Sequence, residues 1–155
     1  MTQDTQATTP AMSSEPLTEE LLERLLASAT PEAYLDQTAT DDRSLSDYLM
    51  DLIDAHGVRR ADVVRRSAVN STFVYQIFAG ERQVGRDNAI KIAFGIGCTL
   101  RETQRLLRHA GLSELWCKNR RDAIIIHCID QGLSLPECDD ELFRLGEQTL
   151  VQREG

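Results

Sequence analysis

The hydrophobic positions of this chain recur mostly every three or four residues, which is the period of an α-helix. In the range 44–57, for example, Leu45, Leu49, Leu52 and Ile53 lie on one face before a glycine stops the pattern. A half-buried strand would need apolar and polar residues to alternate, and such alternation is rare in this sequence. The pattern therefore predicts an all-α protein.

Capping residues sharpen the expected helix bounds. Thr18 precedes two glutamates and Thr30 precedes a proline, so both are candidate N-caps. Thr99 and Ser134 are each followed three residues later by glutamate, which is the spacing of a capping box. The predicted helices begin near Thr18 and then cover about 31–37, 44–56, 59–67, 71–79, 86–97, 99–110, 120–131 and 136–145.

The predicted helices divide the chain into four regions. Residues 1–15 are rich in Thr, Ser and Gln, have little apolar surface to bury, and are expected to form a disordered tail. Residues 16–43 form an acidic helical segment that ends in a polar linker. Residues 44–111 hold five helices and form the expected main domain, and residues 112–150 add a two-helix C-terminal extension.

The stretch 63–82, VVRRSAVNSTFVYQIFAGER, predicts a short helix, a tight turn and a second, more exposed helix. Its valines can bury between two crossing helices, whereas Ser71, Thr72, Tyr75 and Gln76 leave one face of the second helix polar. This pattern is typical of a helix-turn-helix. The polar face has the character needed to read a groove in DNA.

The charge distribution changes how the overall acidity is interpreted. The 155-residue chain has a formal net charge of −8, which by itself argues against a nucleic-acid partner. Residues 1–43 carry nine acidic and two basic side chains, and residues 113–155 carry nine and five. Residues 44–112 carry seven acidic and ten basic side chains, a net charge of +3. The basic segment is the one with the helix-turn-helix pattern, which favours DNA binding there.

The 63–82 stretch, together with the following RDNAIKIAFGIG, resembles the XRE-type, Cro/phage-repressor-like DNA-binding domains over roughly residues 45–110. The resemblance implies a five-helix core that binds double-stranded DNA sequence-specifically, in a transcriptional regulator that works as a homodimer. It also implies that the helix from Ser71 enters the major groove, with Ser71, Thr72 and Gln76 at reading positions. A glutamine amide can both donate to and accept from adenine.

The resemblance further implies which residues position the protein on the DNA backbone. Arg60 begins the first helix of the motif and Arg82 follows the glycine after the second, so both are expected at phosphates. Phe73 and Tyr75 are each expected either at a thymine methyl or sugar or in packing. The predicted DNA-binding set is Arg60, Asn70, Ser71, Thr72, Phe73, Gln76 and Arg82.

Three positions depart from the family pattern. Ala68 stands where the turn usually has glycine, and an alanine at positive φ would cost about 1 kcal/mol. Val64 replaces a small residue near the helix crossing, which suggests slightly wider packing. Ala79 stands where asparagine is common, and Glu81 adds a negative charge near an expected phosphate.

The alternative function is that of a protein-interaction adaptor built on the same fold without DNA binding. The overall acidity and the large share of the chain outside the core favour it, with the N-terminal or C-terminal helices as the surface for a protein partner. The C-terminal helices are also the candidate homodimer interface, because Ile124, Ile125, Leu142 and Leu145 exceed what two short helices need if they pack only on each other. The alternative is that these residues cap the core.

No enzyme chemistry, cofactor or metal site is predicted. His56 ends a helix, His109 is expected on a charged surface turn, and His127 beside Cys128 is expected to be a buried core pair. Cys98, Cys117, Cys128 and Cys138 fit neither zinc-ligand spacing nor a small disulfide framework, so reduced core thiols in a cytoplasmic protein are expected. No segment has the roughly 20 apolar residues that span a bilayer, so no membrane partner is expected.

Overall fold

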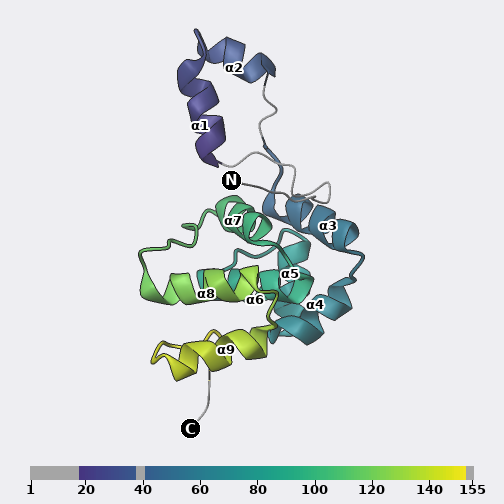
Figure 1. Cartoon of the computed structure of the whole chain (residues 1–155). Helices are drawn as coiled ribbons and strands as arrows, with labels where there is room; N and C mark the ends of the chain where they lie inside the picture. Colours follow the sequence, from purple (N-terminus) through teal and green to yellow (C-terminus); the bar gives the residue numbers. More distant parts are fainter. Residues whose placement is uncertain (1–17, 38–40, 153–155) are drawn as a thin grey trace. The chain divides into compact units, whose positions relative to one another are not determined.

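The computed structural model describes residues 18–37 and 41–152. These residues contain nine helices and no strand, which confirms the predicted all-α class (Figure 1). They belong to two compact units, with the boundary between Asp42 and Arg43. The predicted tail at residues 1–15 lies outside the described residues. None of the described helices has the length and apolar character needed to cross a membrane.

The first unit contains α1 (Thr18–Ala27) and α2 (Pro31–Gln37), which contact each other. The amide of Ala33 donates to Thr30 Oγ1 at 3.1 Å, so Thr30 caps α2 as predicted. The leucines Leu22, Leu25, Leu26 and Leu35 are all exposed. The apolar stripe predicted on α1 is therefore largely uncovered.

The second unit contains the other seven helices, each within one or two residues of its predicted bounds. They are α3 (Leu45–His56), α4 (Arg60–Ser67), α5 (Ser71–Phe78), α6 (Arg86–Ile96), α7 (Leu100–His109), α8 (Arg120–Asp130) and α9 (Leu135–Arg144). Both predicted capping boxes form: Glu102 Oε1 accepts from the Thr99 amide at 2.9 Å, and Glu137 Oε1 accepts from the Ser134 amide at 2.8 Å.

Helix α6 forms the centre of this unit and packs against α3, α4, α7 and α9. Its buried face includes a glycine, Gly95, where an added Cβ would lie 3.0 Å from Ser67 Cβ and 3.1 Å from the Val63 carbonyl oxygen. Small residues at Gly95 and Ser67 therefore let α4 and α6 approach closely. Val64, for which the sequence suggested wider packing, is only half-buried.

Two arginines join α6 to α8 at their N-termini. Arg86 donates through Nη1 and Nη2 to both oxygens of Asp122, at 2.9 and 2.8 Å, and also to the carbonyl oxygens of Ser113 and Glu114. Arg121 donates to both oxygens of Asp87, at 2.9 and 3.1 Å. Each of these two helices thus supplies one arginine and one aspartate to a crossed pair.

Burial and pairing act in opposite directions on Asp122. Burial raises the pKa of this carboxyl, but the hydrogen bonds from Arg86 and from the Trp116 amide outweigh it, so the pKa lies below its ordinary value. The Arg86 pKa is raised, chiefly because its hydrogen bonds to Asp122 stabilise the charged guanidinium. The pair is therefore ionised at neutral pH and fixes α8 to the core.

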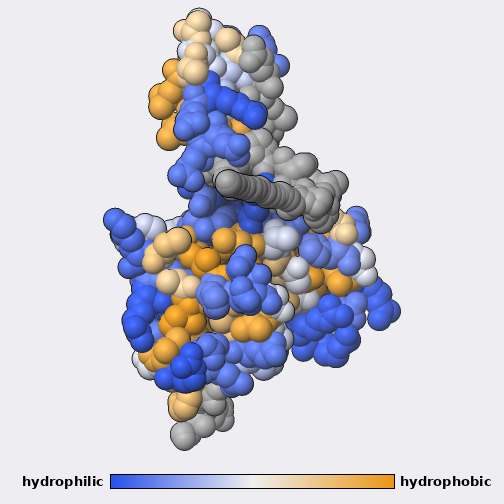
Figure 2. Space-filling view, in the orientation of Figure 1, coloured by the Kyte–Doolittle hydropathy of each residue, from blue (hydrophilic) through white to orange (hydrophobic). Residues whose placement is uncertain are grey.

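This packing corrects the expected interface role of two of the four C-terminal apolar residues, while Ile124 and Leu145 are half-buried. Ile125 and Leu142 are fully buried within the unit, so they stabilise its core and do not offer a surface to another chain. The exposed large hydrophobic residues of this part are Trp116 and Phe143. Figure 2 shows hydrophobic residues gathered over the α8 region among hydrophilic ones.

Three expectations about histidines and cysteines were wrong. His109 is the last residue of α7 rather than part of a surface turn, and its ring stacks on Tyr48 with centroids 4.5 Å apart. His127 is exposed because it lies on the outer side of α8, so only Cys128 of the expected buried pair is in the core. Cys117 is also exposed, since it lies in the loop before α8, whereas the other three thiols are buried and all four are free.

Candidate nucleic-acid interface

The candidate site is built on α4, α5 and the three residues that join them. Helix α4 ends at Ser67, and Ala68 adopts φ +57°, which makes it the one non-glycine residue at positive φ among the described residues. Val69 is buried beneath the turn. Asn70 Oδ1 then accepts from the Phe73 amide at 3.2 Å and caps α5. Ala68 therefore has the positive φ that the sequence analysis considered for this position, a conformation that is strained for an alanine.

Helix α5 divides cleanly into a buried and an exposed face. Val74, Ile77 and Phe78 pack inward. Ser71 and Thr72 are exposed, Tyr75 is 41% exposed, and Gln76 is half-buried. The side chains available to a partner are therefore two hydroxyls, one amide and one phenol, all of which can donate and accept hydrogen bonds.

Two arginines outside α5 lie over aromatic rings of this helix. The Arg60 guanidinium carbon lies 5.5 Å from the centroid of the Tyr75 ring, and the Arg82 carbon lies 5.0 Å from that of Phe73. Arg82 Nη1 also donates to Gln76 Oε1 at 3.4 Å. Such cation–π contacts hold the charged groups against α5 while leaving most of their N–H donors open.

Two neighbouring arginines, Arg65 of α4 and Arg59 at its N-cap, are engaged differently. Arg65 Nη2 donates to Asp62 Oδ1 at 3.0 Å, and Arg59 Nε lies 3.6 Å from Asp62 Oδ2. Hydrogen bonds from the Arg59 amide and the Arg65 side chain lower the Asp62 pKa, so this carboxylate stays charged and partly neutralises both arginines. Arg60 makes no ion pair with any residue in the described part of the chain.

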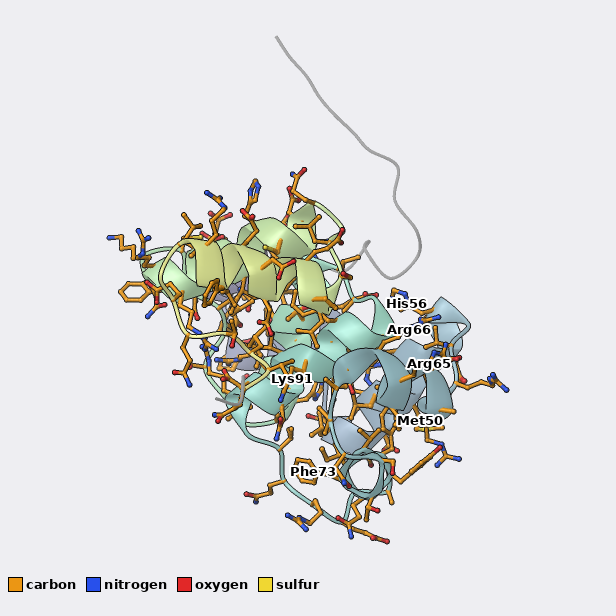
Figure 3. All side chains as sticks on the ribbon, turned by 90° about the horizontal axis from the view of Figure 1, so that it is seen from below. Met50, His56, Arg65, Arg66, Phe73 and Lys91 are labelled. Carbon is orange, nitrogen blue, oxygen red and sulfur yellow. The ribbon has the colours of Figure 1, made fainter. Side chains whose placement is uncertain are left out.

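The view from below shows where these elements lie. In Figure 3, Arg65 and Arg66 project from α4, and Phe73 lies on the side of the unit away from the yellow α9. Glu81 is exposed directly before Arg82 and brings one negative charge to this region. The surface therefore combines basic groups with an acidic neighbour.

The structure brings part of the predicted set together. Arg82 contacts both Phe73 and Gln76. Arg60 lies against the same helix through Tyr75. Ser71 and Thr72 are exposed on the first turn of α5. Asn70 has a structural role because its side-chain oxygen caps the helix.

The predicted set omits Tyr75, which the structure places under Arg60. Its sequence signal is its position on the polar face of α5, three residues after Thr72 and beside Gln76. Among the described residues, no group of three potential metal ligands comes together.

Comparisons of the chain with protein-family models, with curated proteins and with solved structures found no match. The assignment of a function to this surface therefore depends on its geometry and chemistry.

Proposed function

We propose that this protein binds double-stranded DNA sequence-specifically and acts as a transcriptional regulator, with α4, the turn and α5 as an XRE-type, Cro/phage-repressor-like helix-turn-helix. One observation carries the proposal. The exposed face of α5 holds groups that can read bases, and Arg60 and Arg82 lie against the same helix through Tyr75 and Phe73. Both arginines retain N–H donors that no carboxylate occupies in the described part of the chain.

Base reading is assigned to the outward residues of α5. An α-helix fits the major groove of B-DNA, and a recognition helix contacts base edges mainly through its N-terminal turns. Ser71 and Thr72 occupy the first turn, and Gln76 lies one turn further along. The hydroxyls accept or donate at several bases, whereas the Gln76 amide matches adenine.

Backbone contact is assigned to Arg60 and Arg82. A guanidinium that already lies on an aromatic ring loses less conformational freedom on binding a phosphate than one that moves freely in water. The cation–π contacts of Arg60 with Tyr75 and of Arg82 with Phe73 provide this ordering. These two residues fix the register of the helix on DNA and do not read sequence.

The proposal includes a homodimer, because a single module of this size buries little DNA surface. Two copies would place their α5 helices in half-sites roughly 34–36 Å apart. Ile125 and Leu142 are excluded from the interface because they are fully buried. Sedimentation that shows a monomer at tens of micromolar, both free and on DNA, would refute this part.

We propose no catalytic chemistry, metal or cofactor for this protein. We place it in the cytoplasm, where its four free cysteines would remain reduced.

The second candidate function is that of a protein-interaction adaptor. Two observations favour it: arginine with aromatic residues is also the composition of protein interfaces, and α1 exposes leucines such as Leu26 at 75%.

The test is selection from a pool of random duplex DNA with the full chain. We expect an enriched site that contains adenine at a fixed position. The variant Arg60→Ala, Gln76→Ala should enrich nothing. Arg108→Ala is the matched control, because Arg108 is exposed on α7 outside this face and should enrich the same site. Absence of enrichment with the wild-type chain, together with equal weak binding of all three proteins, favours the adaptor.

A further inference from the structure

A cleft opens between the end of α4 and the N-terminal end of α9. These two ends lie beside each other in Figure 1. The cleft has a volume of about 370 Å³, within the range of roughly 300–1,000 Å³ common for small-molecule sites. Its lining comprises Arg65, Arg66, Ala68, Leu135, Pro136, Asp139, Asp140 and Val151.

The apolar part of the lining is held rigidly in place. The Asp139 carboxylate is buried and accepts hydrogen bonds from the amides of Leu150 and Val151, at 2.6 and 2.9 Å. These bonds fix the segment that contributes Val151 to the cleft wall. Leu135, which is also buried, and Pro136 form the first turn of α9. An apolar ligand would meet a preformed surface here.

The charged groups of the lining differ in what they can offer a ligand. Asp139 is satisfied by two backbone amides, and Arg65 already donates to Asp62 at 3.0 Å. Arg66 is exposed and makes no hydrogen bond or ion pair with the rest of the described chain. Its five N–H donors are therefore available to a carboxylate at the cleft edge.

We propose that this cleft binds a small amphipathic monoanion, specifically an aryl or short-chain alkyl carboxylate. Its apolar body lies on Leu135, Pro136 and Val151, and its carboxylate pairs with Arg66. Asp140 on the α9 side disfavours a second negative charge on the ligand. Ala68 lines the same cleft and begins the turn into α5, so a bound ligand touches this turn.

The site does not depend on DNA binding, so it is tested on the full chain without DNA. Phenylbutyrate and its neutral amide are titrated to millimolar concentration while backbone-amide chemical shifts are followed. We expect saturable shifts at the cleft residues. A charge-assisted hydrogen bond should make the carboxylate bind about tenfold more tightly than the amide.

Three variants locate the site. Arg66→Gln should bind the carboxylate no better than the amide, since only the charged partner is removed. Val151→Trp should fill the cleft and abolish binding of both compounds. Arg59→Gln, at the N-cap of the same helix and outside the lining, should behave as wild type. Arg66 is exposed, so its variant will fold even if Val151→Trp does not. Shifts confined to other residues, no saturation, or an unchanged preference in Arg66→Gln would overturn the proposal.

Discussion

The arginines at the α6–α8 junction and those beside α5 occupy opposite environments. Arg86 and Arg121 direct their donors at carboxylates and backbone carbonyl oxygens of the same unit. Arg60 and Arg82 lie on aromatic rings at the surface and have no carboxylate partner among the described residues. One pair of arginines joins helices, and the other is available to a partner.

The difference shows how the same side chain takes two roles. Removing a guanidinium from water is costly and is offset only when several hydrogen bonds replace the lost water, as Asp122 and two carbonyl oxygens do for Arg86. A guanidinium over a ring stays hydrated and keeps donors for an external acceptor. An arginine whose N–H donors are bonded within the protein has a structural role, whereas one whose donors remain open is available for binding.

The largest expected effect is on the free energy of unfolding. Arg86→Ala leaves the Asp122 carboxylate buried without its charged partner and should lower this free energy by about 3–5 kcal/mol. Arg82→Ala is the matched surface control and should change it by no more than about 0.5 kcal/mol. Urea denaturation measures both values. Equal losses in the two variants would remove the distinction between the two environments.

The next effect concerns base reading. Gln76→Ala should weaken binding to the selected duplex by about 1–3 kcal/mol and relax the base preference at one position. Binding to random duplex should hardly change, because no phosphate contact is lost. Fluorescence anisotropy with both duplexes measures the two affinities, and an equal loss on both would exclude Gln76 as a reader.

A smaller effect is expected for backbone contact. Arg60→Ala should weaken binding to all duplexes alike and reduce the slope of log affinity against log salt by about one, because one phosphate loses its partner. Arg65→Ala is the control on the same helix, since Arg65 is already paired with Asp62. If both variants reduce the slope equally, the ion pair with Asp62 does not keep Arg65 from the phosphates, and the prediction is wrong.

The smallest effect is expected at the turn. Ala68 has φ +57°, so Ala68→Gly should relieve strain and raise the free energy of unfolding by up to about 1 kcal/mol. The greater freedom of glycine in the unfolded chain offsets part of this gain. Thermal unfolding of the variant and the wild type measures the change, and a clear loss of stability would contradict the argument.

Local sequence signals predicted much of the fold. Thr99 and Glu102 form their capping box because both partners lie within one helical turn, so spacing alone places them. Arg86 and Asp122 lie 36 positions apart, and nothing local selects one aspartate among the many acidic residues of the chain. His109 was misplaced for the same reason, since its stacking partner Tyr48 comes from another helix.

The candidate site shows the same limit. The polar face of α5 follows from helical period, so the exposure of Ser71 and Thr72 was predictable. An asparagine directly before a helix is a local signal for an N-cap. The same side chain was expected to contact DNA, and in the structure its oxygen caps α5 instead. The Arg60–Tyr75 contact joins two helices across the turn, and helical period does not reveal it.

Mapping the DNA contact on the protein tests the central claim most directly. Backbone-amide chemical shifts of the full chain are compared with and without the selected duplex. We predict that the largest changes fall on the N-terminal turn of α4, on α5 and on Arg82, while α8 and the amides around Trp116 stay nearly constant. Largest changes on α8 and α9, with α5 unaffected, would contradict the account.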